Sequence, residues 1–489
     1  MAYIHGAYAT IGSISSTVVE DCKVGIVYVG TAPVHTVPGG NERVNVPVVC
    51  NSMADARALL GYSDDWATYT LCEAMHTHFE LNGVGPVIFI NVLDPVAHAK
   101  SEATTASLTP ANGRIIIADA ENVYLDSIVI ASKEKGKDYI VSYNADKKVV
   151  TITELTPGAL GTSPVSVTYN TIDAASVEES DIIGTDDGLG KTTGLSAVAQ
   201  VYQTTGYIPS ILACPGFSSV KAVHDAMYAV SKKVNGHWDM YMFADLALKN
   251  GGSTISLDQA ATWKKTNGYT HDNETVFFPG AIGTDGKVYH LSVLACANFH
   301  SVLVGNEGIP YMTASNTACP IIAGLYTGDG STAPVLDDTI INRTLNANGI
   351  ASAAFVGGKW VIWGRHCADY DQDNADMLNV SETNRMMLYY LSNDFQARRT
   401  ENVDKPLTVN DLRAIVAEEQ ARLDALVKIG ALTYGVVYIS AETLNKSDVY
   451  NGDYQFSFQI TTTQLSKSLT AVVNWTQDGF TTYFEAFGL

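Results

Sequence analysis

Two nearly uninterrupted apolar runs restrict the fold of this chain more than any other feature. Residues 24–30 read Val-Gly-Ile-Val-Tyr-Val-Gly, and residues 86–92 form the second run. A strand that is apolar at almost every position is typical of a parallel sheet covered on both faces. Between the runs, Ser52 caps a predicted short helix that stops at Gly61, and a longer helix is predicted over residues 65–81. This order predicts a right-handed βαβ crossover.

The pattern changes near Lys100. Residues 104–190 are rich in Thr, Ser, Val and Ile and carry few helix signals. Residues 139–153 predict a hairpin, with alternating strands on either side of a turn at 144–146. We therefore expect a compact all-β domain inserted between two α/β parts.

The α/β pattern returns after Gly194, and an amphipathic helix is predicted from Thr408 to a stop at Gly430. The other predicted elements are strands at 208–213, 238–245, 275–278, 290–295 and 359–363, a helix at 219–234, and closing strands at 434–439, 454–462 and about 469–474. With 489 residues, the chain has room for about three domains.

The charge of −21 argues against a nucleic-acid backbone or an anionic membrane as partner. Residues 1–339 hold 18 Lys and Arg against 34 Asp and Glu, so this acidic part is the better candidate for a solvent-facing exterior. No run of about 18 apolar residues predicts a membrane span, and residues 1–20 do not resemble a signal peptide. Seven cysteines without a CxxC pair indicate buried thiols made in a reducing cytosol, Cys22, Cys214 and Cys296 among them.

Residues 188–192, Gly-Leu-Gly-Lys-Thr, nearly match a phosphate-binding loop. The first glycine of that motif is replaced by Thr185, and Asp186 and Asp187 would place two carboxylates inside the phosphate cradle. We expect a polar loop and no bound nucleotide.

Other chemical motifs are incomplete. Asp369, Asp371 and Asp373 imitate the start of a calcium loop whose later glycine and glutamate are missing. The remaining candidates are His76 with His78, which would point to different faces of a helix, and His366 with Cys367, which are adjacent in sequence. No G-x-S-x-G elbow is present, although residue counts leave a hydrolase triad open. We expect no catalytic residues, no metal, no cofactor and no enzyme activity.

Several short motifs in a fixed order resemble the sheath proteins of contractile phage-type tails. They are Gly6-Ala-Tyr8, residues 24–33, 53–61, 79–83 and 86–92, Ile208-Pro-Ser-Ile-Leu-Ala-Cys-Pro-Gly216, Thr344-Leu-Asn-Ala-Asn-Gly-Ile350, Lys359-Trp-Val-Ile-Trp-Gly-Arg365 and residues 430–435. One departure is His366, where threonine is common. The middle domain of that family is called subtilisin-like for its α/β layout, and the label implies no protease activity.

The resemblance implies an α/β multidomain fold: a sheath-type α/β core with an inserted all-β domain, an α+β C-terminal domain, and extended N- and C-terminal arms. The expected parts are an N-terminal arm (1–20), an N-terminal α/β sheath domain (21–103), an outward-facing inserted β domain (104–192), a subtilisin-like α/β domain (193–370), a C-terminal domain facing the tube (371–468) and a C-terminal arm (469–489).

In the family, both arms add strands to sheets of neighbouring subunits. The corresponding candidates here are Tyr3, Ile4, Tyr8, Ile11, Leu469, Val472, Val473 and Trp475. Pairing of both ends within their own subunit is the alternative. Arg385, Arg398 and Arg399 are candidate contacts with the tube, although an ordinary surface helix would account for them equally well.

The implied function is a structural subunit that polymerises around an inner tube and contracts to drive it through a target cell envelope. The implied partners are the chain itself as a helical or stacked-ring homopolymer, the inner tail tube protein, and the baseplate and tail terminator proteins, without direct nucleic acid or membrane insertion. The expected location is a virion tail or phage tail-like particle, assembled in the bacterial host cytoplasm. A multidomain surface-binding or decoration protein of a virion is the alternative, and a hydrolase on an α/β core is a further one.

Overall fold

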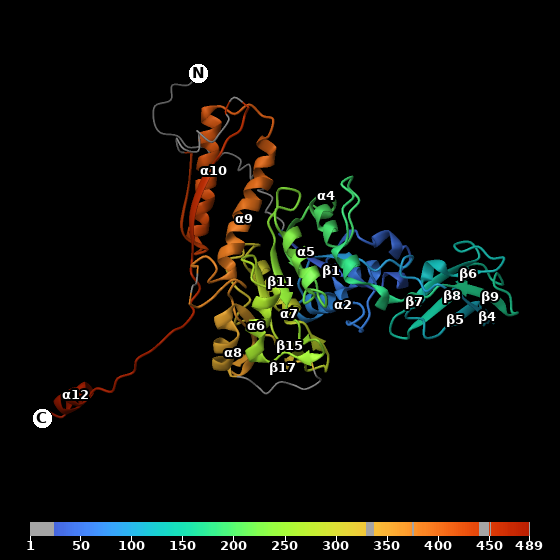
Figure 1. Ribbon diagram of the computed structural model, residues 1–489, viewed down its shortest axis with the longest axis horizontal. Coiled ribbons are helices and arrows are strands. Elements are labelled where there is room, and N and C mark those ends of the chain that lie inside the picture. The colour runs from blue at the N-terminus through green and yellow to red at the C-terminus, as the bar shows by residue number, and fades with distance from the viewer. Residues whose placement is uncertain (1–23, 329–336, 374–375, 440–448, 450, 489) are drawn as a thin grey trace, which may run out of the picture. The chain divides into compact units, whose positions relative to one another are not determined.

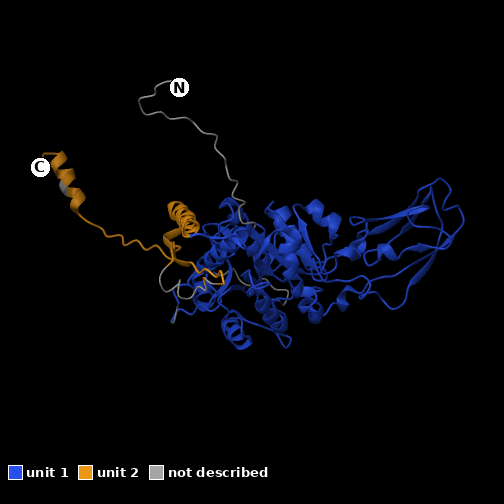
Figure 2. Cartoon of the chain, turned by 90° about the horizontal axis from the view of Figure 1, so that it is seen from above, with its two compact units in different colours: residues 1–408 blue, residues 409–489 orange. Residues whose placement is uncertain are grey.

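The computed structural model describes residues 24–328, 337–373, 376–439, 449 and 451–488 (Figure 1). The chain divides into two compact units, residues 1–408 and residues 409–489, which Figure 2 colours separately. The first unit is built on an eight-stranded sheet with the order β19-β18-β14-β11-β10-β1-β3-β2. Its strands are β1 (Val24–Gly30), β2 (Pro47–Cys50), β3 (Val87–Asn91), β10 (Ile208–Ala213), β11 (Tyr241–Asp245), β14 (Glu274–Phe277), β18 (Ile350–Val356) and β19 (Lys359–Trp363).

The predicted parallel sheet is confirmed. β1 lies between β3 and β10 and is parallel to both, and only β2 and β19 run antiparallel to their neighbours. Alternate residues of β1 enter two separate cores. Ile26 and Tyr28 lie in one apolar cluster, while Val27 and Val29 lie in another. Burial on both faces is the reason why β1 is apolar throughout.

Helices cover both faces of the sheet. In the first unit they are α1 (Met53–Leu59), α2 (Leu71–Met75), the π-helix η3 (His76–Leu81), α3 (Glu179–Ile183), α4 (Val201–Thr205), α5 (Lys221–Ser231), α6 (Leu257–Asn267), α7 (Leu291–Gly305), α8 (Asp338–Thr344) and α9 (Glu382–Arg399). The predicted cap of α1 is confirmed, because the Ser52 side chain accepts a hydrogen bond from the N–H of Asp55 at 3.2 Å.

Two secondary-structure predictions for the first unit are wrong. The helix expected from residue 65 begins at Leu71, because Thr31 binds the backbone N–H groups of Thr70 and Leu71 and holds the chain in turns before the helix. The strand expected at 290–295 belongs to α7. This helix is buried on nearly every side, so its sequence lacks the periodicity that separates a helix from a buried strand.

The inserted β segment forms two three-stranded sheets, β4-β9-β6 and β5-β8-β7. Their strands are β4 (Thr104–Leu108), β5 (Arg114–Ile117), β6 (Val129–Ile130), β7 (Tyr139–Asn144), β8 (Val149–Glu154) and β9 (Val165–Tyr169). The predicted hairpin is the pair β7–β8. The strands end at Tyr169, and Ile182 of α3 is buried in the core of the α/β body, so residues 179–192 do not continue the β-sheets as the range 104–192 implied.

Shorter strands complete the first unit. A three-stranded sheet has the order β16-β15-β17, formed by β15 (Gly280–Gly283), β16 (Val288–Tyr289) and β17 (Ile322–Tyr326), and a small hairpin joins β12 (Lys249–Asn250) to β13 (Ser253–Thr254).

The second unit contains α10 (Val409–Lys428), a two-stranded antiparallel sheet of β20 (Leu432–Tyr438) and β21 (Ser457–Thr462), and α12 (Asp478–Ala486). The predicted helix and the first two closing strands are confirmed. α9 belongs to the first unit, since Met386 lies in its core and Asn393 binds the backbone of Asp239. The expected C-terminal domain, 371–468, is therefore divided between the two units.

Within the described part of the chain, no helix is both long and apolar enough to cross a membrane. The six cysteines described there are free and buried. Cys22 lies outside the described residues.

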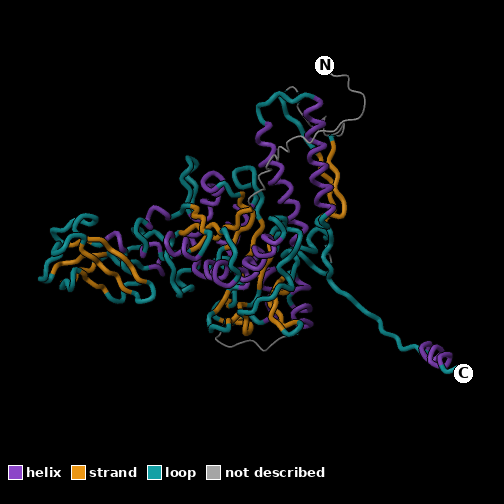
Figure 3. The backbone as a smooth tube through the Cα atoms, turned by 180° about the vertical axis from the view of Figure 1, so that it is seen from behind, coloured by secondary structure: helices purple, strands orange, loops and turns teal. Residues whose placement is uncertain are grey.

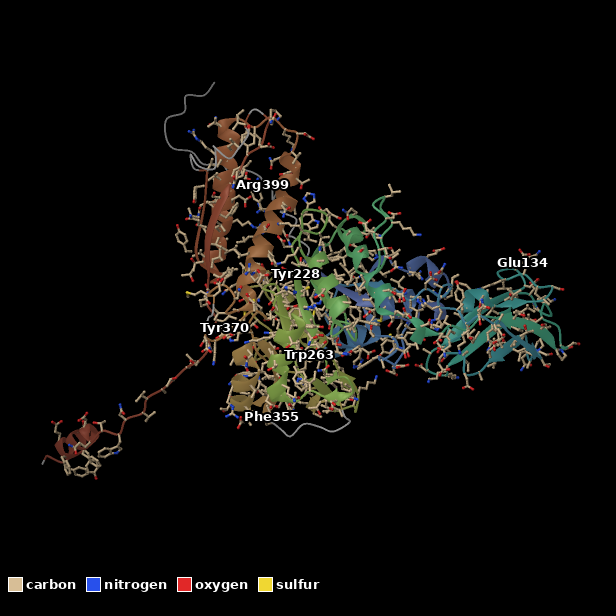
Figure 4. All side chains as sticks on the ribbon, in the orientation of Figure 1. Glu134, Tyr228, Trp263, Phe355, Tyr370 and Arg399 are labelled. Atoms are coloured by element: carbon tan, nitrogen blue, oxygen red, sulfur yellow. The ribbon has the colours of Figure 1, made fainter. Side chains whose placement is uncertain are left out.

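Because the sheet is covered on both faces, we expect two of its phenylalanines to differ in how much they contribute to stability. Phe89 on β3 is fully buried, whereas Phe355 on β18, labelled in Figure 4, is 46% exposed. We expect Phe89→Ala to cost about 3–5 kcal/mol of stability through the lost contacts and the cavity left behind. The matched variant Phe355→Ala should cost about 1 kcal/mol, mainly from its contact with Trp360. Urea unfolding followed by tryptophan fluorescence measures the stability of both variants. An equal loss of stability would contradict the placement of Phe89 in the core and Phe355 at the surface.

Candidate assembly surfaces

The C-terminal segment exposes an unusual amount of apolar surface. Leu469, Val472, Val473 and Trp475 are 92, 80, 91 and 79% exposed. Phe480, Tyr483, Phe484 and Phe487, on or next to α12, are 49–66% exposed. Soluble proteins seldom leave large contiguous apolar patches in water unless a partner covers them. Residues 469–487 therefore form a candidate assembly surface.

The strand predicted at about 469–474 is absent. Residues 463–476 have no regular secondary structure, and α12 follows them, as Figure 3 shows by the change from loop to helix. A strand requires a neighbour for its backbone N–H and C=O groups. The sequence identified a segment able to form a strand, but none of the described strands pairs with it.

The sheet β20–β21 offers edges for a further strand. Each of its two strands pairs only with the other among the described residues. Leu423 and Leu426 of α10 and Val437 of β20 are buried, so helix and sheet share a small core. The edge strand of a sheet is a template for β-strand addition.

The three arginines on α9 are placed differently from one another. Arg385 lies 2.9 Å from the Asp272 carboxylate and donates to Asn379 at 2.9 Å. Arg398 donates from Nε and from NH2 to Asp394, both at 2.8 Å. Arg399, labelled in Figure 4, is half-buried near the end of the helix. Arg385 and Arg398 thus have carboxylate partners within the chain.

The candidate N-terminal contacts Tyr3, Ile4, Tyr8 and Ile11 lie outside the described residues. Their role stays a prediction.

The loop that resembles a phosphate-binding motif is occupied by its own carboxylates. Asp186 accepts from the N–H of Gly188 at 2.8 Å, and Asp187 accepts from the N–H groups of Leu189 and Lys191 at 2.7 and 3.0 Å. These are the backbone donors that a phosphate would require. The same bonds hold the pKa of Asp187 below its usual value. The predicted repulsion between loop and nucleotide thus has a geometric basis.

Three residues that the sequence analysis did not single out form a buried cluster. Ligand-type atoms of His224, His271 and Glu274 lie within 4.8 Å of one another. Both oxygens of Glu274 already accept hydrogen bonds, from His224 Nε2 at 2.5 Å and from the backbone N–H of His271 at 3.0 Å. The cluster joins α5 to β14 through hydrogen bonds. Sequence spacing gives no signal for it, because His224 and Glu274 are 50 residues apart.

A second buried cluster lies at the start of α7, whose first backbone N–H groups have no acceptors within the helix. Glu73 accepts from the N–H of His290 at 2.6 Å, and Asp245 accepts from the N–H of Ser292 at 3.0 Å. Carboxylates are favoured at this end of a helix because they satisfy free N–H groups and oppose the helix dipole. The two acids hold α7 against α2 and β11.

The same cluster contains Ser, His and Asp but does not arrange them as a catalytic triad. The Ser292 hydroxyl donates to Asp245, and His290 Nδ1 lies 2.6 Å from the Glu73 carboxylate. A serine nucleophile requires a hydrogen bond to its histidine base. Burial raises the pKa of Asp245, opposed by the charge of His290 and the bonds from Ser292. The arrangement stabilises a helix terminus.

The protonation state of His290 predicts how the stability of the folded chain depends on pH. Burial lowers its pKa, but the charge and hydrogen bond of Glu73 outweigh that effect and raise the pKa to about 9. The unfolded value is about 6.5. Because the folded value is the higher one, the stabilisation is complete below pH ~6.5 and is lost as pH rises through about 9. We therefore expect His290→Gln to lower Tm at pH 6 and to have a much smaller effect at pH 10.

Thermal unfolding between pH 6 and pH 10 at constant ionic strength measures this difference. His237→Gln, at an exposed histidine, is the matched control and should show no such trend. A loss of Tm in His290→Gln that does not vary with pH would show that the side chain acts only through packing.

Comparison with known proteins shows which sequences and which fold this chain resembles. No known protein-family profile matches the chain. The chain is 29% identical over 238 residues to the tail sheath protein of Burkholderia phage BcepMu, a match that covers 47% of this chain. It is 22% identical over 321 residues to the major tail sheath protein of Serratia phage KSP20, covering 65% of this chain. The chain spans about half the length of the BcepMu protein (46%) and 76% of the KSP20 protein.

The fold agrees with two solved sheaths. The helical sheath of the anti-feeding prophage in its contracted state matches with a TM-score of 0.52 at 14% identity, over 98% of this chain and 100% of that chain. The contracted sheath complex of the extracellular contractile injection system PVC matches with a TM-score of 0.54 at 11% identity, over 98% and 99%. The predicted resemblance to contractile tail sheath proteins is therefore confirmed, in sequence by phage relatives and in fold by injection-system sheaths.

Proposed function

We propose that this chain is the sheath subunit of a contractile tail. It polymerises around an inner tube as a helical or stacked-ring homopolymer and contracts to drive the tube through a target cell envelope. The similarity to two phage sheath proteins and the fold shared with two contractile sheaths support this proposal. The further partners are the inner tail tube protein, the baseplate and the tail terminator, in a virion tail or phage tail-like particle assembled in the host cytoplasm.

The exposed apolar segment 469–487 is the observation that carries the proposal. A segment that leaves Leu469, Val473 and Trp475 in water has free energy to gain by pairing with a second copy of the chain. Backbone groups along the outer edge of β20 would supply partners for it. Each added main-chain hydrogen bond contributes about 0.5–1.5 kcal/mol net. Residues 1–20 would link a different neighbour in the same way.

Contraction in such an assembly requires two packings of one subunit that differ by a few kcal/mol, with the extended packing held by a barrier. Arms that join neighbouring bodies by strand pairing would preserve connectivity while the bodies rotate. The work then comes from refitted contacts between subunits and needs no nucleotide hydrolysis. The acidic β insertion would face outward.

Deletion of residues 469–489 tests whether the C-terminal arm is required for assembly. We expect the truncated protein to remain folded, with Tm changed by no more than about 2 °C, because its large apolar side chains are half or more exposed and contribute little to the subunit core. We expect it to form no cylinders under conditions in which the full chain does. Negative-stain electron microscopy of each protein, alone and co-expressed with the tube protein, measures assembly.

A matched control replaces the exposed Val96 with Ser and should leave assembly unchanged. Isolated particles from the full chain under both conditions would contradict the sheath proposal. Cylinders formed by the truncated protein would leave the sheath function standing but remove the C-terminal arm from its mechanism.

The α9 arginines remain proposed contacts with the tube. Arg399 is the last residue of α9, and reversing its charge tests the contact at this end of the helix. We expect Arg399→Glu to reduce co-sedimentation with tube protein severalfold, while circular dichroism shows that the variant remains folded. Arg343→Glu on α8 is the control. Equal recovery of tube with both variants would remove Arg399 from the interface.

A further inference from the structure

A side-chain amide already occupies part of the β20 edge. Gln420 of α10 donates from Nε2 to the carbonyl oxygen of Gly435 at 3.1 Å, and its Oε1 accepts from the N–H of Val437 at 3.0 Å. One planar amide thus supplies both a donor and an acceptor to backbone groups two residues apart. A peptide group of a neighbouring strand would make the same two kinds of bond.

These two backbone groups lie on the side of β20 that faces away from β21. In an antiparallel pair, the backbone groups of successive residues alternate between the two edges of a strand. The N–H of Val437 points to Gln420, so Val437 and Gly435 direct their polar groups to the outer edge, while Val436 between them faces β21. Gln420 therefore covers the part of the edge at which a further strand would pair.

The local geometry allows this contact and also allows it to open. Gly435 lets α10 approach, because a Cβ at this position would lie 3.1 Å from Leu423 Cβ. Gln420 Nε2 has a second acceptor, Asp424 Oδ1, at 2.8 Å. The amide can leave Gly435 and keep a hydrogen bond on its own helix. Opening the edge therefore leaves the Gln420 Nε2 group with a partner.

Residues 469–475 have the pattern of an edge strand. In an extended conformation, Leu469, Ala471, Val473 and Trp475 would share one face, and Thr470, Val472 and Asn474 the other. This alternation, apolar on the first face and mostly polar on the second, suits a strand laid along a sheet with one covered face. Leu469, Val473 and Trp475 are 79–92% exposed and available.

We propose that Gln420 holds the β20 edge closed in the free subunit and is displaced by residues 469–475 of a second copy of this chain. The edge is then protected from premature pairing until a strand arrives that makes more backbone bonds than one side chain does. This inference rests on the proposed sheath function and adds the position and control of the accepting edge.

Binding of a labelled peptide of residues 467–477 to the full-length chain tests the proposal. We expect Gln420→Ala to bind the peptide about tenfold more tightly than the unmodified chain, because two competing hydrogen bonds are gone. Asn410→Ala, which removes an exposed amide from the same helix, is the matched control and should bind like the unmodified chain. Fluorescence anisotropy measures affinity, and hydrogen exchange reports the Val437 amide, which should exchange faster in Gln420→Ala and become protected by the peptide.

If Gln420→Ala fails to fold, Gln420→Glu keeps the length of the side chain and an acceptor for Val437 but cannot donate to Gly435, and it should show a smaller gain. Equal or weaker binding by a folded variant would overturn the proposal, as would binding that leaves Val437 unprotected. These outcomes are independent of the sheath function, which fails only if the full chain forms no cylinders with its tube.

Discussion

The pairing of β1 with both β3 and β10 is the constraint on which the first unit depends. β1 and β10 are separated by the β insertion, yet they are neighbours in the middle of the sheet. A parallel sheet of this kind must be covered on both faces, and the two apolar clusters that receive alternate residues of β1 meet this requirement. The insertion has its own core and its own sheets, so it leaves this pairing undisturbed.

The polar residues inside the first unit reinforce the same arrangement. Glu73 and Asp245 reach the start of α7 from two different elements, and the Glu274–His224 pair joins α5 to the strand beside β11. Buried charges are tolerated only when they are paired or bonded to several donors. Each cluster meets this condition by joining elements that are distant in the sequence.

The second unit has the opposite character. Its sheet has two strands, and its C-terminal segment carries large apolar side chains that are 49–92% exposed. A two-stranded sheet is marginal by itself, and the contact of Gln420 with β20 satisfies part of an edge that would otherwise lie open. A well-packed first unit and a second unit with a two-stranded sheet and an exposed apolar segment are consistent with the proposed sheath subunit.

The apolar runs at 24–30 and 208–213 were sufficient to predict β1 and β10, because both strands are short, bounded by turn signals and buried on both faces. The order of short motifs was sufficient for the resemblance to sheath proteins. The sequence could not distinguish α7 from a strand, since total burial removes periodicity, and it placed a strand at 469–474 where a single chain offers no partner. The cluster of Glu73, His290 and Asp245 and the contact of Gln420 with β20 were decided by tertiary structure alone. Hydrogen-bond partners are set by distance in space, and local pattern records only which face of an element is apolar.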